Sequence, residues 1–140
     1  MAAGEELARM LIPVEDVMRS PPVVVWPTHR ISAVVRAMIE RNVGSVIVVS
    51  DDERIRGIVT ERDILARVVV EGKTADATEV KDVMSAPVLT IDHKASLRDA
   101  LKLMRDNNVR RLAVMKEGRV DGQVTERRIL DAMIFISQLD

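Results

Sequence analysis

Hydrophobic residues follow two different spacings along this chain, and the two spacings alternate. Short runs of valine and isoleucine, such as residues 45–49, are typical of buried strands. From Ile31, apolar residues instead recur every three or four positions, with Arg36 and Glu40 on the other side, which predicts an amphipathic helix that Gly44 ends. The elements expected in this half are strands at residues 23–25, 45–49 and 55–60, and helices that begin at residues 31 and 61.

The second half of the chain repeats this order. The nine residues from Gly57 to Leu65 return as Gly122 to Leu130, and only two of the nine positions differ. The matching elements are strands at residues 88–91, 111–115 and 120–125, and helices at residues 96–107 and 126–139. Two copies of one strand–helix–strand–strand–helix unit explain this pattern, whereas a solenoid would need at least three copies.

One three-stranded sheet cannot cover both of its faces by itself, so the two copies are expected to pack together. We therefore predict an α+β fold of two tandem β-α-β-β-α repeats, packed sheet to sheet with pseudo-two-fold symmetry. The cleft between the repeats would lie beside both strand-to-helix corners. The expected boundaries are an N-terminal helix or arm at 1–13, a first repeat at 14–71, a polar linker at 72–79 and a second repeat at 80–140.

Composition removes several classes of function. The chain has no cysteine, which excludes disulfides, thiolate metal sites and a catalytic thiol. A formal net charge of −1 and only two aromatic residues argue against nucleic-acid binding. No apolar run approaches the ~18 residues of a membrane span, and the first ten residues do not form a signal peptide. We expect a cytoplasmic protein without a membrane segment, and no enzyme, because no carboxylate pair lies beside a nucleophile.

The two histidines, His29 and His93, precede the first helix of each repeat. They are candidates for a metal ion shared between the repeats, but neither has a second histidine or a cysteine at ligand spacing. We therefore expect loop histidines and no metal site.

Thr60 and Asp63 occupy the first strand-to-helix corner, and two interpretations of them stay open. Thr-x-x-Asp before an apolar run is the signature of a capping box, worth about 1 kcal/mol. The same corner also suits a nucleotide, because a helix N-terminus attracts phosphate and a carboxylate accepts hydrogen bonds from both hydroxyls of a ribose. Gly57 would let the strand approach such a ligand, or would serve packing alone.

The second corner keeps Thr125 but replaces the carboxylate by Arg128. A cation in the first helical turn opposes the helix dipole by ~0.3–1 kcal/mol, so a pure capping box would not favour it. Together with Arg127 it would clamp a phosphate; the alternative is a solvent-facing arginine. Arg110 and Arg111 would join them if the two repeats face each other.

These features resemble the cystathionine-β-synthase (CBS) domain pair, or Bateman module, over about residues 14–135. The residues that carry the resemblance are the doubled Asp-Val-Met starts, the Pro-Val strands and the Gly-Ile-Val-Thr-Glu-Arg-Asp corner. The resemblance implies a regulatory module that is not itself an enzyme. It implies an adenosine ligand (AMP, ADP or ATP, alternatively S-adenosylmethionine or a NAD-type compound), a homodimer, and a regulated protein on another chain.

The resemblance also assigns residues to a nucleotide site. Asp63 would hold the ribose and Thr60 the phosphate or ribose side, Arg127 would meet phosphate, and the adenine would lie between Ile58 and Val88-Leu89. The quasi-symmetric second site would use Val23, Val24, Arg110, Arg111, Val124, Thr125 and Arg128. This second site lacks the ribose carboxylate, so we expect it to be weak, empty or specific for anions alone.

In this interpretation the ligand favours one relative orientation of the repeats, which a partner or dimer mate then detects. The rival interpretation is a dimeric interaction scaffold with no physiological nucleotide, in which Asp63→Asn is nearly silent. A third is RNA or DNA binding through the arginines of the second repeat, which would depend steeply on salt.

Overall fold

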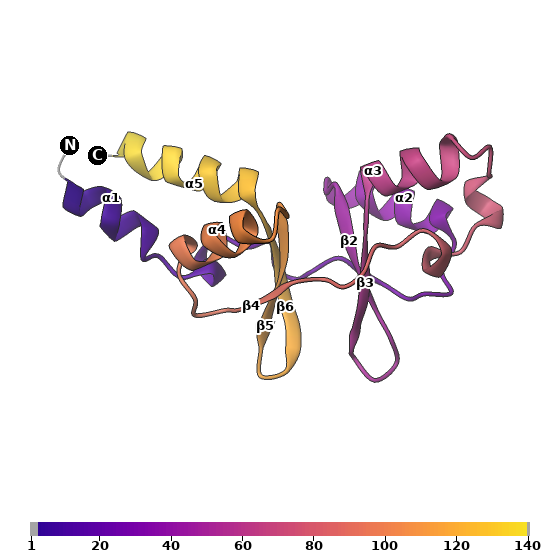
Figure 1. The fold of residues 1–140 in the computed structure, drawn as a ribbon, viewed down its shortest axis with the longest axis horizontal. Coiled ribbons are helices and arrows are strands. Elements are labelled where there is room, and N and C mark those ends of the chain that lie inside the picture. The colour runs from indigo at the N-terminus through magenta and orange to yellow at the C-terminus, as the bar shows by residue number, and fades with distance from the viewer. Residues whose placement is uncertain (1–2, 140) are drawn as a thin grey trace. The chain divides into compact units, whose positions relative to one another are not determined.

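The computed structural model describes residues 3–139, which form two compact units (Figure 1). The central unit is the continuous segment Pro22–Val88, and the terminal unit combines the chain up to Pro21 with the chain from Leu89. These units cut across the sequence repeats, because residues 14–18 open the first repeat but belong to the terminal unit.

The central unit has a three-stranded sheet in the order β1-β2-β3. Strand β2 is parallel to β1 and antiparallel to β3, and both helices lie on one side of the sheet (Figure 1). This is the predicted strand–helix–strand–strand–helix order. Its elements are β1 (Val24–Val25), α2 (Ile31–Arg41), β2 (Ser45–Val49), β3 (Ile55–Thr60) and α3 (Glu61–Ile64), the last continued by a π-helical turn (Leu65–Val69) and followed by 3-10 turns at Ala75–Ala77 and Val80–Asp82.

Helix α2 ends at Arg41, three residues before the predicted Gly44. Asn42 takes the left-handed conformation with φ 54°, and its N–H donates to the carbonyls of Met38 and Ile39. Asparagine is one of the few residues other than glycine that tolerates this conformation. The prediction that Gly44 terminates the helix was therefore wrong.

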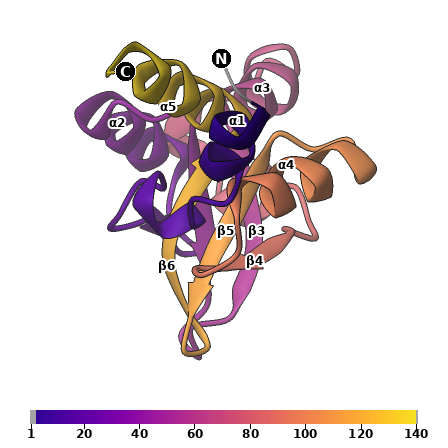
Figure 2. The same cartoon turned by 90° about the vertical axis from the view of Figure 1, so that its left-hand side faces the viewer.

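The terminal unit repeats the same architecture around the sheet β4-β5-β6. Strand β5 is parallel to β4 and antiparallel to β6. The helices α1, α4 and α5 lie on one side of this sheet, with α1 packed against α4 (Figures 1 and 2). The elements are α1 (Ala3–Met10), a 3-10 turn (Val14–Asp16), β4 (Thr90–Asp92), α4 (Leu97–Asp106), β5 (Arg111–Lys116), β6 (Arg119–Thr125) and α5 (Glu126–Leu139).

Each unit has its own hydrophobic core between the sheet and its helices. In the central unit, Val34 from α2 and Val46 from β2 are fully buried, together with Val80. In the terminal unit, Leu97 from α4 is fully buried, together with Val14. The two valines occupy matching positions in the repeats, so each repeat contributes its opening valine to the core that contains the other repeat's strands. No helix within residues 3–139 is long and apolar enough to cross a membrane.

Glu15 ties the N-terminal turn of the terminal unit to the loop before α4. Its carboxylate lies 2.7 Å from Nδ1 of His93 and 2.6 Å from Nζ of Lys94. The hydrogen bond from His93, and then that from Lys94, lower the pKa of Glu15 to about 2. The same pair raises the pKa of Lys94 above its usual value.

We expect Glu15→Gln to lower the melting temperature near neutral pH and to lose this effect in acid. Because the folded-state pKa of Glu15 is depressed from 4.5 to about 2, its stabilisation is complete above pH 4.5 and disappears as the pH falls through 2. Thermal unfolding of both proteins between pH 6 and pH 2 measures the gap. Glu40→Gln, on an exposed face of α2, is the control; a gap for Glu15→Gln that stays constant with pH would contradict the prediction.

Candidate functional site

The corner between β3 and α3 is a capping box, as predicted. The N–H of Asp63 donates to Oγ1 of Thr60 at 3.1 Å, and the N–H of Thr60 donates to Oδ2 of Asp63 at 2.9 Å. Both side chains are partly buried. The capping interpretation is thus confirmed, and it leaves the other carboxylate oxygen available for a different partner.

That other oxygen is held by a residue that sequence reasoning missed. Ser85 Oγ donates to Oδ1 of Asp63 at 3.0 Å. The main chain of Ser85 also pairs with Ile58 in both directions, with N···O distances of 2.9 Å. The Asp63 carboxylate is therefore fixed both by its own helix start and by the segment that follows the Val80–Asp82 turn.

Gly57 explains how this segment comes so close to β3. A Cβ atom at Gly57 would lie 2.8 Å from the Ser85 carbonyl oxygen and 2.9 Å from Sδ of Met84. The group that packs closely against Gly57 is therefore the segment of Met84 and Ser85 in the same chain. Gly122 has the same role in the terminal unit, where a Cβ would meet Met18 and the Arg19 carbonyl oxygen.

The residues predicted for the first nucleotide site divide between the units. Ile58, Thr60, Asp63 and Val88 belong to the central unit. Leu89 and Arg127 belong to the terminal unit, where Leu89 packs against the core. The Arg127 side chain is 91% exposed, and its Nε lies 3.9 Å from Asp131 one helical turn later.

Arg128, the most unusual residue of the second corner, binds the main chain of its own unit. Thr125 still caps α5, accepting from the Arg128 N–H at 3.1 Å. The Arg128 Nε donates to the Val17 carbonyl. In the central unit the matching carbonyl, that of Val83, accepts instead from Arg67 at 2.7 Å. Arg128 therefore makes the hydrogen bond that Arg67 makes in the central unit, although Arg128 lies one helical turn earlier in its helix. This hydrogen bond offsets the free-energy cost of a cation at a helix start.

Other residues of the predicted second site also lie around the α5 corner. Arg111 pairs with Thr125 across β5 and β6, and the Arg110 carbonyl accepts from the N–H of Glu126 at 2.9 Å. Nε of Arg111 is buried and has no hydrogen-bond partner within the described residues. Of the remaining residues, Val124 is buried in the terminal core, Val23 is buried in the central core and Val24 is exposed on β1.

Arg19 is a second residue that sequence reasoning missed. It pairs with Gln123 through the main chain, as Ser85 pairs with Ile58 in the central unit. The terminal corner therefore has arginines at the positions where the central corner has small or acidic residues. These matched positions are Arg19 and Ser85, Arg111 and Ser45, and Arg128 and Asp63. One corner presents a carboxylate, and the other presents guanidinium groups.

The two histidines lie in loops, as expected. His29 accepts at Nδ1 from the Trp26 N–H at 2.9 Å and stacks on the indole with a centroid distance of 5.6 Å. His93 contacts Glu15. Within residues 3–139, no group of three or more histidine, aspartate or glutamate side chains is arranged to hold a metal ion.

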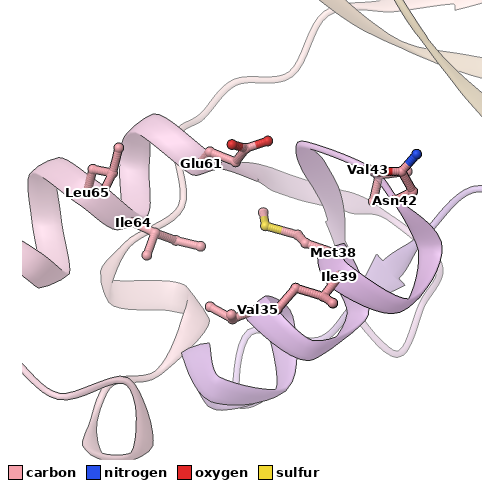
Figure 3. Close-up of a pocket in the computed structure, with 8 residues that line it drawn as sticks. All are labelled: Val35, Met38, Ile39, Asn42, Val43, Glu61, Ile64 and Leu65. Atoms are coloured by element: carbon pink, nitrogen blue, oxygen red, sulfur yellow. The ribbon is translucent and has the colours of Figure 1, made fainter.

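A groove of about 510 Å³ lies on the helical side of the central unit (Figure 3). It is mostly apolar, with Glu61 and Asn42 as its polar groups, and it does not include Thr60 or Asp63. Ile39 in this groove is 74% exposed and Leu65 is 59% exposed. The residues that line the groove are Val35, Met38, Ile39, Asn42, Val43, Glu61, Ile64 and Leu65.

Comparison with known proteins gives the family. The CBS domain model matches residues 14–70 and again residues 80–134. The chain therefore belongs to the CBS domain family, as a tandem pair, and such pairs are generally regulatory, ligand-binding modules.

Several curated proteins are similar over most of this chain. An uncharacterized protein of Methanopyrus kandleri is 35% identical over 85% of this chain and 61% of its own length. The mitochondrial CBS domain-containing protein CBSX3 of Arabidopsis thaliana is 32% identical over 71% of this chain and 50% of its own length. This chain thus spans 61% of the length of the first relative and half of the length of the second. Protein YhcV of Bacillus subtilis, also named for its CBS domains, is 32% identical and matched over 78% of its length.

Solved structures share the fold over nearly the whole chain. An uncharacterized conserved protein from Pyrococcus horikoshii has a TM-score of 0.77 at 28% identity, with 88% of this chain and 92% of that chain covered. Hypoxic Response Protein I, solved with two coordinated zinc ions, has a TM-score of 0.73 at 27% identity, covering 85% of this chain and 97% of its own. These likenesses confirm the predicted α+β class.

Proposed function

We propose that this CBS pair is a regulatory module that binds an adenosine nucleotide, AMP, ADP or ATP, at the corner of the central unit. The observation that carries the proposal is the Asp63 carboxylate, held at a helix start by two hydrogen bonds and lying beside the Thr60 hydroxyl. S-adenosylmethionine and NAD-type compounds contain the same adenosine group and are the alternatives.

The chemistry of the corner suits this ligand class. A carboxylate is an acceptor only, and it recognises a pair of neighbouring hydroxyls, which a ribose supplies. The Thr60 hydroxyl is a donor for a phosphate, whereas the N–H groups of Glu61 and Asp63 already donate to the Gly44 carbonyl and to Thr60. The arginine-rich terminal corner has the opposite character, so it would take an anion without a sugar.

Regulation would follow from a shift in conformational populations. The nucleotide stabilises the conformation that binds it better, and a regulated protein or a second copy of the chain detects that conformation. The module itself performs no catalysis in this proposal, and its setting is the cytoplasm. Nucleic acid is not the proposed partner.

A thermal-shift panel tests the proposal. The panel measures the wild type and Asp63→Ala with AMP, ADP, ATP, S-adenosylmethionine and NADH. Asp76→Ala, in the 3-10 turn at Ala75–Ala77, is the control. A ligand at 100 times its dissociation constant adds ~2.7 kcal/mol, or roughly 8–10 °C for a chain of this length. We expect one compound to give this shift in the wild type and the control but not in Asp63→Ala. No shift with any compound would leave the corner as a capping box alone.

The second candidate function is a dimeric interaction scaffold, which the groove of the central unit favours. Its apolar residues Ile39 and Leu65 are well exposed, whereas α4 has Arg105 at the position that matches Ile39 and is packed against α1. We propose that a second copy of the chain covers the groove with its own groove, because two-fold pairing of one patch with itself is the commonest arrangement of homodimers. Dimer formation is compatible with nucleotide binding, so the two functions are separable by experiment.

A further inference from the structure

We propose that Ser85 is a positioning residue that holds the Asp63 carboxylate for the neighbouring hydroxyls of a ribonucleotide. This inference rests on the proposed function and adds a residue that determines specificity for the sugar. Ser85 lies 22 positions beyond Asp63 in sequence, and its hydroxyl donates to Asp63 at 3.0 Å.

Each of the two carboxylate oxygens of Asp63 accepts one hydrogen bond. Thr60 N–H occupies one acceptor site on Oδ2, and Ser85 Oγ occupies one acceptor site on Oδ1. An ionised carboxylate has about four acceptor sites, so each oxygen keeps one further site. Two neighbouring hydroxyls need this arrangement, with one acceptor on each oxygen and the plane of the carboxylate fixed in advance.

Ser85 is itself held firmly enough to fix that plane. Its N–H and carbonyl both pair with Ile58 on β3, and its carbonyl lies against Gly57, where no side chain fits. Arg67 holds the two residues before it, donating to the carbonyls of Val83 at 2.7 Å and Met84 at 3.0 Å. The hydroxyl of Ser85 is therefore anchored through the main chain on both sides.

The terminal unit changes both members of this pair together. Arg19 stands where Ser85 stands, and Arg128 stands where Asp63 stands. Arg19 makes the same main-chain pairing with Gln123 that Ser85 makes with Ile58. The main-chain pairing therefore does not require a serine at this position. The two units share the fold, but the serine is present in the unit that has the carboxylate and absent from the unit that lacks it.

The test compares a ribonucleotide with its 2′-deoxy form. Calorimetry measures AMP and 2′-deoxy-AMP, and likewise ATP and 2′-deoxy-ATP, against the wild type, Ser85→Ala, Ser85→Thr and Asp63→Asn. We expect the wild type to prefer the ribonucleotide by about tenfold or more, the range of a hydrogen bond to a charged group. Ser85→Ala should reduce this ratio about three- to fivefold, and Ser85→Thr should restore it. Ser20→Ala is the control, since its hydroxyl donates to the Asp121 carbonyl at 2.9 Å and not to a carboxylate.

The outcomes separate this inference from the proposed function. If Ser85→Ala weakens both sugars equally, so that the ratio is unchanged, Ser85 is a structural residue and the inference fails while nucleotide binding stands. If the wild type binds none of the adenosine compounds of the thermal-shift panel, both the inference and the proposed nucleotide function fail. A ratio that falls in Ser85→Ala as it falls in Asp63→Asn, and returns in Ser85→Thr, supports the inference.

Discussion

Gly122→Ala is expected to destabilise the protein by about 1–3 kcal/mol, the usual cost of forcing extra volume into a packed site. A Cβ atom there would overlap Sδ of Met18 and would lie 2.8 Å from the Arg19 carbonyl oxygen. The methionine can move, but the carbonyl cannot, because the Arg19 N–H and carbonyl both bond to Gln123. Relief of the clash therefore requires the N-terminal segment to move away from β6.

Urea unfolding of Gly122→Ala, Gly57→Ala and Gly4→Ala measures this effect. Gly57→Ala should cost a similar amount, since its Cβ would lie 2.8 Å from a carbonyl oxygen and 2.9 Å from a methionine sulfur. Gly4 lies in α1 with no atom within 4 Å of an added Cβ, so Gly4→Ala should be neutral or slightly stabilising. A change below about 0.5 kcal/mol for both Gly57→Ala and Gly122→Ala would contradict the close approach of the two segments.

Ile39→Arg is expected to convert a dimer of this chain into a monomer. The substitution introduces the residue type that α4 has at the matching position, Arg105, into an apolar groove where Ile39 is 74% exposed. In a two-fold interface each substitution counts twice, and each one buries a guanidinium group in an apolar groove whose acidic lining residue is Glu61. We expect the dissociation constant of the dimer to rise at least a hundredfold, which corresponds to about 2.8 kcal/mol.

Sedimentation analysis over a range of protein concentrations measures the change. The control is Val70→Arg, because Val70 is 77% exposed and follows the π-helical turn after α3 but does not line the groove. Unfolding curves check that both variants remain as stable as the isolated wild-type chain. A wild type that stays monomeric, or an Ile39→Arg variant that still dimerises as the wild type does, would exclude this groove as the interface.

The repeat made most of the fold predictable. Alternating runs of β-branched residues and helically spaced apolar residues occur twice in the same order, and the strands and helices lie within about two residues of their predicted positions. The capping box was equally accessible, because Thr60 and Asp63 are three residues apart and contact each other through local geometry. Local signals of this kind need no knowledge of the tertiary structure.

The parts that the sequence did not reveal depend on contacts between distant segments. Ser85 reaches Asp63 only because Gly57 admits the segment after Met84, and the repeat alignment alone does not bring these residues together. Arg128 was expected either to clamp an anion or to face solvent, whereas it donates to Val17, which is 111 positions away. One signal was available: the paired change from Asp63 and Ser85 to Arg128 and Arg19 marks two positions that vary together within one chain.

The crossing of Val14 and Val80 has a consequence for how such a chain arises and survives. The first buried valine of each repeat packs in the core that contains the other repeat's strands. The boundaries of the sequence repeats therefore differ from the boundaries of the compact units. The central unit is in effect an insertion within the terminal one. Deleting either repeat at its sequence boundary would remove a residue from the interior of the survivor, which ties the two copies together as a single inherited unit.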